Sequence, residues 1–201
     1  MRMIFKRLLD FVIAALGLIV VSPILLGIAL FIRLRDGSPV FYAATRVGQH
    51  GRLFHQYKFR TMVPTRGSSV TVWGDPRVTS SGRILRRSKL DELPQLFNVL
   101  LGDMSLVGPR PEDPSYVSLY TPEQLRVLDA KPGITGIAAL EYVDEESMLK
   151  SEDWESEYRE RIMPAKLQLE AEYQMRRSFW TDMQILFRTF TTVLGRLRGT
   201  K

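Results

Sequence analysis

The sequence predicts a monotopic membrane protein of the α+β class, mainly helical, with an N-terminal re-entrant membrane helix and a compact domain that contains a β-hairpin. Three observations predict this: an uncharged apolar run at residues 11–32, two β-rich segments around a short turn at residues 40–59, and helical apolar spacing in much of the remainder. We expect the membrane segment to occupy residues 1–35 and the compact domain residues 36–201. A chain of 201 residues can bury one such core.

The apolar run, FVIAALGLIVVSPILLGIALFI, is long enough to cross a bilayer core, because roughly 22 helical residues extend about 33 Å. Ser22 and Pro23 lie at its middle. Proline removes a backbone donor and clashes with the preceding turn, so we expect a break or kink there. The Ser22 hydroxyl can then bond a carbonyl that the proline frees. Each half of the run alone is too short to cross.

Basic residues flank both ends of this run, three within residues 2–7 and two within residues 33–35. Positive charge tends to stay on the cytoplasmic side of a membrane. The pattern therefore favours a helix that enters, bends at Ser22–Pro23 and leaves by the same face. The alternative is a proline-kinked transmembrane helix. A cleaved signal peptide does not fit, because the run is too long and no small-residue cleavage site follows it.

Residues 40–48 and 52–59 are rich in β-branched and aromatic residues, and Gln49-His50-Gly51 lies between them, which predicts a hairpin. The Gly/Ser/Pro-rich residues 63–82 predict a surface loop. A helix beginning near Asp91 carries an apolar stripe and ends at Gly102. Another helix starts at residues 121–124, with proline at its first position.

Towards the C-terminus, KPGITG at residues 131–136 predicts a turn, and residues 151–175 have a helical pattern interrupted at Pro164. The last segment, residues 178–199, is an amphipathic basic helix. Such a helix can lie on a membrane surface, or it can pack one face against an ordinary core. Both interpretations remain open from these residues.

Composition excludes some chemistry and favours anionic partners. The formal net charge is +6, which suits nucleic acid, anionic lipid or phosphorylated substrates. There is no cysteine, so disulfides, zinc–thiolate sites and cysteine nucleophiles are excluded. His50 and His55 are the only histidines and have no acidic cluster nearby in the sequence, which argues against a histidine metal site.

The adjacent pair Asp91–Glu92 is the main candidate for chemistry. Asp91 is placed to cap its helix, and a helix N-terminus keeps a carboxylate ionised and attracts phosphate. Successive helical residues point about 100° apart, so the two carboxylates face different partners. A carboxylate can attack phosphorus to form an acyl phosphate. The alternative is that Asp91 only caps, Glu92 is solvated and nearby arginines balance their charge.

Basic residues surround this pair. Four of them lie between residues 83 and 89, and Arg110 follows between Pro109 and Pro111, which stiffen its backbone. Arginine binds phosphate bidentately, and arginines with Mg²⁺ neutralise charge when a carboxylate approaches a phosphate. The pattern predicts a diphosphate site. It argues against a nucleic-acid groove, since the carboxylates would repel a phosphate backbone.

Three segments, residues 46–62 (RVGQHGRLFHQYKFRTM), residues 75–111 (DPRVTSSGRILRRSKLDELPQLFNVLLGDMSLVGPRP) and KPGITG, resemble the bacterial sugar transferase family. These are the monotopic phosphoglycosyl transferases that begin bacterial glycoconjugate assembly. Residues 7–26 (RLLDFVIAALGLIVVSPILL) resemble the family's re-entrant membrane helix with its Ser-Pro break. The resemblance covers nearly the whole chain and is to the small form of the family.

The resemblance implies that Asp91 is a nucleophile. It would attack the β-phosphate of a UDP-sugar, release UMP and carry a covalent phosphosugar. A polyprenol phosphate, typically undecaprenyl phosphate, would then accept the phosphosugar and leave as a polyprenol diphosphate sugar. This would be the first membrane step of glycoconjugate or exopolysaccharide synthesis.

The resemblance also assigns the neighbouring residues. Glu92 would act as a base for the lipid phosphate or help to place Mg²⁺, so that Asp91 and Glu92 are the expected metal residues. The basic positions of the phosphate site and the prolines that shape its loop are Lys58, Arg86 and Arg110, and Pro109 and Pro111. After KPGITG the sequence reads IAALEYVDEES where many members read LAQVNGR, in a region associated with sugar choice.

The implied partners are a UDP-sugar, a polyprenol phosphate and the membrane, without nucleic acid and with a homodimer as one possible assembly. The implied location is the cytoplasmic face of the bacterial inner membrane, with a catalytic domain whose amphipathic helices lie at the interface. Two other functions fit the residues: a membrane-bound nucleotide-sugar phosphohydrolase that uses water as acceptor, and a non-enzymatic membrane adaptor that binds anionic lipid.

Overall fold

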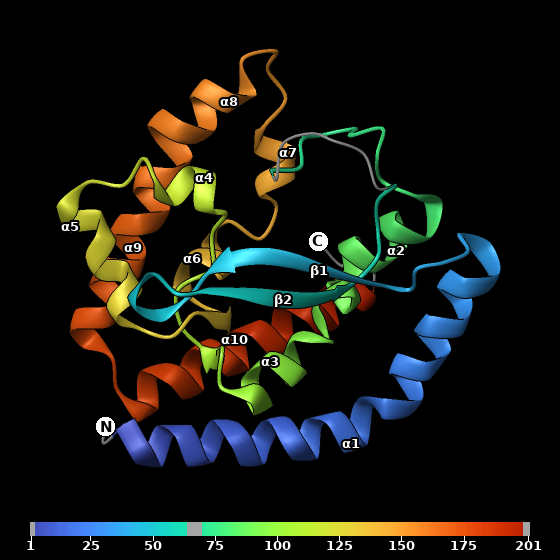
Figure 1. The fold of residues 1–201 in the computed structure, drawn as a ribbon, viewed down its shortest axis with the longest axis horizontal. Coiled ribbons are helices and arrows are strands. Elements are labelled where there is room, and N and C mark those ends of the chain that lie inside the picture. The colour runs from blue at the N-terminus through green and yellow to red at the C-terminus, as the bar shows by residue number, and fades with distance from the viewer. Residues whose placement is uncertain (1–2, 64–69, 199–201) are drawn as a thin grey trace.

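The computed structural model describes residues 3–63 and 70–198. Its first element is the long helix α1 (Met3–Arg35), which contains Pro23. The chain stays helical through the proline, while the ribbon lies along one side of the domain and then turns upward (Figure 1). The Ser22 hydroxyl donates to the Ile19 carbonyl at 2.8 Å. Pro23 leaves that carbonyl without its helical donor, so the bond expected from the sequence is confirmed.

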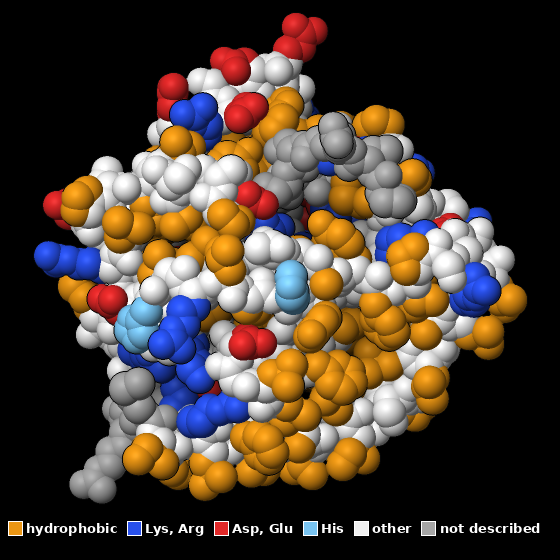
Figure 2. All heavy atoms as spheres, in the orientation of Figure 1, with side chains coloured by type: hydrophobic (Ala, Val, Ile, Leu, Met, Phe, Trp, Pro, Cys, Tyr) orange, Lys and Arg blue, Asp and Glu red, His pale blue; other side chains and the backbone are white. Residues whose placement is uncertain are grey.

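Helix α1 is long and apolar enough to cross a membrane, and only 11% of its apolar window is buried. Large apolar side chains cover its outer surface, among them Leu16, Ile19, Val20 and Leu26. Figure 2 shows apolar side chains gathered along the edge where Figure 1 places α1. An exposed apolar helix of this kind fits association with a membrane.

The predicted hairpin is confirmed. Strands β1 (Phe41–Val47) and β2 (Leu53–Phe59) pair antiparallel, from Phe41 opposite Phe59 to Val47 opposite Leu53. The turn between them is η1 (Gln49–Gly51), where His50 and Gly51 both have positive φ. The two strands cross the middle of the molecule in Figure 1.

A second sheet was not predicted. Strand β3 (Ser105–Val107) pairs in parallel with β4 (Gly133–Thr135), so the prediction that KPGITG is only a turn is wrong. Three residues are too few to show an alternating pattern, and this strand exists only through its distant partner. It brings KPGITG beside GPRP.

The loop predicted at residues 63–82 falls partly on residues 64–69, which lie outside the described residues. Residues 70–79 contain turns and a single antiparallel bridge from Val78 to Met62. Helix α2 (Ser80–Ser88) already begins within the predicted loop, capped by the Thr79 side chain, which accepts from the Gly82 amide. Val70 is buried in a core cluster, so this loop is not confined to the surface.

The remaining elements are short except near the C-terminus. They are η2 (Leu90–Glu92), α3 (Gln95–Leu101), α4 (Pro114–Val117), α5 (Pro122–Leu125), η3 (Arg126–Asp129), α6 (Ile137–Glu141), α7 (Glu145–Met148), α8 (Trp154–Glu157), η4 (Tyr158–Ile162), α9 (Met163–Arg176) and α10 (Phe179–Leu197). Gly102 ends α3 with φ 95°, and Thr121 with Gln124 forms a capping box on α5, so both of these predictions are confirmed.

The helical pattern predicted for residues 151–175 is confirmed from Trp154 onward, but Pro164 does not interrupt it. The proline lies in the first turn of α9, where its missing N–H is tolerated. The irregularity is the π-helical segment η4 just before it. In α10, Asp182 and Ile185 face the interior while Trp180 and Phe187 are exposed, so this helix both packs and presents apolar side chains.

Helix α1 is packed against the domain near both of its ends. Ala14 joins a core cluster with Val99 and Met104, in which Ile185 of α10 also takes part. Further along, Ile32 packs with Phe59 of β2 and Leu85 of α2. The guanidinium of Arg60 then donates to the carbonyls of residues 36, 37 and 38, which fixes the chain just after α1. The frame of the site is therefore built around α1, β2, α2 and α3.

Candidate active site

Asp91 and Glu92 lie in the one-turn segment η2, between α2 and α3. Lys89 precedes them in the left-handed conformation, with φ 59°. Helix α3 begins only at Gln95, after Pro94, and no side chain caps it. The prediction that Asp91 caps this helix is therefore wrong. Pro94 separates the single turn η2 from the start of α3, and the Asp91 side chain on that turn is buried in the domain.

Asp91 is 5% exposed. Its Oδ1 atom has no hydrogen-bond partner within the described residues. Burial, followed by the charge of Glu92, raises the pKa of Asp91 to about 6, against the pull of Lys58, Arg86 and Lys89. At neutral pH most molecules therefore hold Asp91 ionised, with one oxygen unoccupied by the protein.

Glu92 has the opposite environment. Its Oε1 atom accepts from the Lys58 ammonium at 2.9 Å and from the Arg110 guanidinium at 2.9 Å. Burial opposes ionisation of Glu92, but Arg110 and Lys58 outweigh it and hold its pKa well below the usual range. Burial in turn lowers the pKa of the Lys58 ammonium. Lys58 reaches Glu92 from β2, so the hairpin supplies one side of the site.

Arg110 lies in the loop after β3, and this loop is locked against β4. The Gly108 amide donates to the Thr135 carbonyl at 3.0 Å, and the Gly133 amide donates to the Pro109 carbonyl at 2.8 Å. A Cβ on Gly108 or Gly133 would meet backbone atoms at 2.3 or 2.1 Å. Only glycine permits so close a crossing. GPRP and KPGITG are thus one structural unit.

Arg86 forms its ion pair away from Asp91 and Glu92. Its guanidinium forms an ion pair with Glu146 of α7, and it lies 3.8 Å from the Met62 sulfur. It still lowers the pKa of Asp91 through its charge. The structure therefore brings together Asp91, Glu92, Lys58 and Arg110, with Arg86 at the edge. Pro109 and Pro111 flank Arg110 as expected, whereas Ser22 and Pro23 lie within α1.

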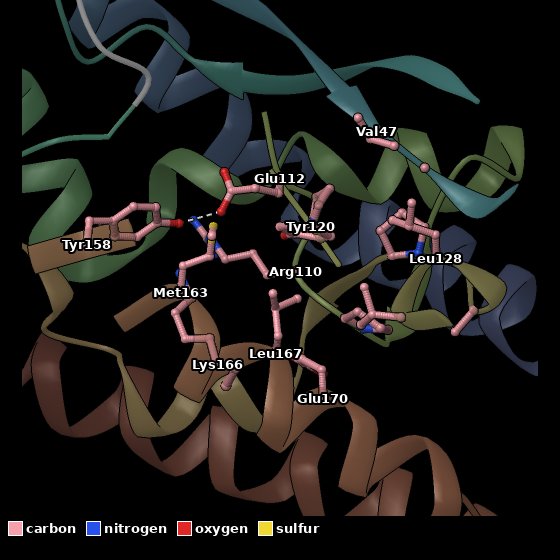
Figure 3. Close-up of a pocket in the computed structure, with 17 residues that line it drawn as sticks. Val47, Arg110, Glu112, Tyr120, Leu128, Tyr158, Met163, Lys166, Leu167 and Glu170 are labelled. Carbon is pink, nitrogen blue, oxygen red and sulfur yellow. Dashed lines mark hydrogen bonds between the residues drawn. The ribbon is translucent and has the colours of Figure 1, made fainter. Parts of the chain in front are cut away.

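A small cavity lies behind the Arg110 loop (Figure 3). Its volume of about 30 Å³ leaves room for roughly two water molecules. Glu112 and Tyr158 join across it through a hydrogen bond from the tyrosine hydroxyl, and Lys166 and Glu170 line it from α9. The sequence did not single out Glu170 or Glu146, because each is one acidic residue among many in a charged helical segment.

Metal binding would depend on few protein ligands. No group of three or more His, Cys, Asp or Glu side chains suitable for a metal occurs in residues 3–63 and 70–198. The free Oδ1 atom of Asp91 suits one bond to a hard cation. The Oε1 atom of Glu92 is already held by two cationic side chains, so only Oε2 of Glu92 is available for a second bond.

Comparison with known proteins gives a consistent result. The sequence model of the family described as "Bacterial sugar transferase" matches residues 1–196. The "Uncharacterized sugar transferase EpsL" of Bacillus subtilis is 42% identical over 193 residues, which cover 96% of this chain and 88% of the relative.

Two relatives with more specific names also align. The "UDP-glucose:undecaprenyl-phosphate glucose-1-phosphate transferase" of Caulobacter vibrioides is 39% identical, over 94% of this chain and 69% of the relative. The "Undecaprenyl-phosphate galactose phosphotransferase" of Salmonella typhimurium is 36% identical, over 95% of this chain and 40% of the relative. The chain thus spans less than half the length of some relatives that it matches.

Proposed function

The chain belongs to the bacterial sugar transferase family, and from this membership we propose that it transfers a sugar 1-phosphate from a UDP-sugar to undecaprenyl phosphate. The product is an undecaprenyl diphosphate sugar, which initiates polysaccharide synthesis. The single observation that carries the proposal is the buried Asp91, with one free carboxylate oxygen beside a Glu92 that two cations hold.

Asp91 is the proposed nucleophile. Its free oxygen attacks the β-phosphorus of the UDP-sugar, a new P–O bond forms, and the bond to the UMP oxygen breaks with the electron pair leaving on UMP. An oxygen of undecaprenyl phosphate then attacks the same phosphorus, and the Asp91 carboxylate leaves. A carboxylate with a pKa near 6 is ionised at neutral pH and needs no base to attack, unlike a serine.

Glu92 acts by position rather than as a base. A carboxylate whose pKa lies well below the usual range holds a proton poorly, so Glu92 is a weak base for taking a proton from the lipid phosphate. What Glu92 does is join Lys58 on β2 to Arg110 on the β3–β4 unit. Two cationic side chains, Lys58 and Arg110, are thereby held on one carboxylate next to Asp91, where they neutralise diphosphate charge.

Mg²⁺ is the metal that we propose for this site. The donor set fits, because Mg²⁺ commonly takes one or two carboxylates and completes its shell with water and substrate phosphates. Glu92 Oε2 would hold it together with the Asp91 oxygen that does not attack phosphorus. When bound, it would add positive charge to the transferring phosphate. Activity that persists in excess EDTA would refute this requirement.

We propose that α1 is re-entrant and that the domain lies on the cytoplasmic face of the bacterial inner membrane. Two attachments of α1 to one domain support it: Arg7 donates to the Val99 and Leu100 carbonyls of α3, and Ile32 packs with Phe59 and Leu85. A helix that crossed the bilayer would place these two attachments on opposite sides. A bend that lets α1 enter and leave by one face keeps both.

Cysteine labelling tests this topology, since the natural chain has no cysteine. Ile4→Cys and Ser38→Cys each introduce one thiol beside an end of α1. Impermeant maleimide should label both in inside-out vesicles and neither in intact spheroplasts. If one site is labelled in spheroplasts, α1 spans the membrane and the proposed topology is wrong.

The activity is tested by radiolabel transfer from a panel of UDP-sugars to undecaprenyl phosphate. We expect lipid-linked product with one sugar, UMP release before lipid is added, and ping-pong kinetics. Without lipid, the peptide that contains Asp91 should gain the mass of one phosphosugar. Free sugar phosphate as the product would indicate the hydrolase instead. A function that survives Asp91→Asn would indicate the membrane adaptor.

A further inference from the structure

Glu170 is the buried charged group that the proposed reaction does not use. It belongs to α9 and is 3% exposed. Neither carboxylate oxygen has a hydrogen-bond partner of normal geometry in the part of the chain that the structure describes. A buried carboxyl group without firm partners costs folding free energy, so its presence requires an explanation.

The surroundings of Glu170 are specific. The backbone N–H groups of Ala138 and Arg110 approach the carboxylate closely enough to favour its charged form. A Cβ on Gly136 would lie 3.3 Å from the Glu170 Oε1 atom and 2.4 Å from the Gly108 carbonyl oxygen. Glu170 therefore lies beneath the crossing of GPRP and KPGITG, and it lines the cavity from α9 (Figure 3).

The cationic side chains around Glu170 are bonded to other carboxylates. Lys166 favours its charged form but donates to Glu145 at 2.6 Å. The Arg110 guanidinium also favours it and is bound to Glu92. The phenols of Tyr120 and Tyr173 have their pKa values raised, by burial first and in part by the charge of Glu170. None of these groups is hydrogen-bonded to Glu170 within the described residues.

We propose that Glu170 is a positioning residue for the Arg110 loop, and that its charge sets how the loop presents Arg110 to the substrate diphosphate. Ionised Glu170 draws in the Arg110 and Ala138 amides, whereas neutral Glu170 attracts them weakly. The path from Glu170 to the reaction is short: the Arg110 backbone, its guanidinium, and Glu92 at 2.9 Å. The inference rests on the proposed function only in assigning phosphate to Arg110.

The proposal predicts that the affinity for the UDP-sugar changes near neutral pH. Burial, against the pull of the two amides, Lys166 and Arg110, raises the pKa of Glu170 to about 7. As pH falls through this value, Glu170 takes up a proton and the loop loosens. The KM for the UDP-sugar should therefore rise as pH falls from 8 to 6.

Glu170→Gln tests this by keeping the shape of the side chain and removing its charge. We expect a KM for the UDP-sugar about tenfold above that of the wild type at pH 8 and no change in KM between pH 6 and 8. Glu170→Asp retains the charge and should keep the pH dependence, with a smaller rise in KM. Glu172→Gln, on the same helix, is the matched control and should behave as the wild type. A wild-type KM profile in Glu170→Gln overturns the proposal.

A second measurement does not depend on turnover or on that variant. In Asp91→Asn, which cannot react and lacks the nearby titration, calorimetry gives the affinity for whichever UDP-sugar the wild type uses. The diphosphate of a UDP-sugar does not titrate in this range, so the affinity should fall about tenfold from pH 8 to pH 6. An affinity independent of pH overturns the role of Glu170. If the wild type turns over no UDP-sugar, it is the proposed function that fails.

Thermal unfolding separates this role from a purely structural one. A carboxyl group whose folded pKa is raised costs stability when it ionises, so folding stability is lost as pH rises towards 7. Glu170→Gln removes that loss and should therefore unfold at a higher temperature than the wild type at pH 8 while binding substrate more weakly. A variant that loses stability at pH 8 along with affinity would show that Glu170 only supports the fold, which overturns the proposal.

Discussion

The molecule buries charge in two places, and the two clusters differ in how completely their polar atoms are paired. The anchor cluster (Lys6, Asp10, Ser105, Tyr173 and Asp182) joins the start of α1 to β3, α9 and α10. The Lys6 ammonium donates to Asp182 at 2.7 Å and lies 3.8 Å from Asp10. Asp10 accepts from the Ser105 hydroxyl at 2.7 Å, and Asp182 also accepts from the Tyr173 hydroxyl. Each charge in this cluster has a partner.

The dyad cluster (Lys58, Asp91, Glu92 and Arg110) is paired only in part. Its Glu92 is held by two cations, but the Asp91 Oδ1 atom lacks a partner among the described residues, as do the Nε of Arg86 and both oxygens of Glu170 nearby. Buried groups that are fully paired fix a structure, whereas buried groups without partners destabilise it. From this difference we infer that the charges of the anchor cluster attach α1 to the domain, whereas the unpaired Asp91 oxygen is available to a substrate under the proposed function.

Asp91→Asn is expected to have the largest effect. The amide is a poor nucleophile, so UMP release and lipid product should both fall by at least about 10⁴-fold. Stability should change in the opposite direction. The raised pKa of Asp91, about 6 instead of 3.8, means that folding stability is lost as pH rises between these values. At pH 8 the variant should therefore gain roughly 1–3 kcal/mol in chemical unfolding.

A loss of stability in Asp91→Asn at pH 8 would contradict the difference between the two clusters, since the unpaired carboxylate would then be contributing to the fold. Glu152→Gln, a change of the same kind outside both clusters, is the control and should alter neither activity nor stability. Equal activity in Asp91→Asn and the wild type would contradict the assignment of the nucleophile itself.

Lys6→Met is expected to have the second largest effect, and on stability. It leaves Asp182 and Asp10 buried without their cation, a change that costs about 3–5 kcal/mol in such sites. Chemical unfolding in detergent measures it, with Lys150→Met at an exposed position as the control. The folded fraction should keep its pH profile of kcat, because Lys6 does not set the pKa of Asp91. A loss below about 1 kcal/mol would show that the anchor cluster contributes little attachment.

The sequence predicted the dyad cluster better than the anchor cluster, for a physical reason. Asp91 and Glu92 are adjacent, and Arg110 lies only 18 residues after Glu92, so this part of the pattern is local. Lys58 was expected only from the family resemblance. The hairpin is local too. Lys6 was interpreted only as a flank of the apolar run, because its partner Asp182 lies 176 residues away. Strand β4 and the position of Glu170 depend in the same way on contacts that form only in the folded chain.

The capping role of Asp91 was wrong for a different reason. The sequence pattern treated the chain from Asp91 to Leu101 as one helix, whereas Pro94 separates a single turn from α3. The same residue types therefore gave candidates that the structure brings together, but in the wrong local geometry. Asp91 is kept ionised at neutral pH by three nearby cations acting against burial, and no helix N-terminus is required.

The smallest expected effect concerns Arg86, the predicted phosphate residue that the structure pairs with Glu146. The Glu146 side chain is 44% exposed, so this ion pair contributes at most about 1 kcal/mol to stability. If Arg86 binds the substrate diphosphate, Glu146 competes with it. Glu146→Gln should then lower KM for the UDP-sugar about threefold, leave kcat unchanged and change the free energy of unfolding by less than about 0.5 kcal/mol.

Glu141→Gln, which frees Arg188 from a similarly exposed pair, is the matched control and should leave KM unchanged. A higher KM in Glu146→Gln would mean that Glu146 holds Arg86 in place for the substrate. The ion pair would then fix the position of Arg86, as pairing fixes the charges of the anchor cluster.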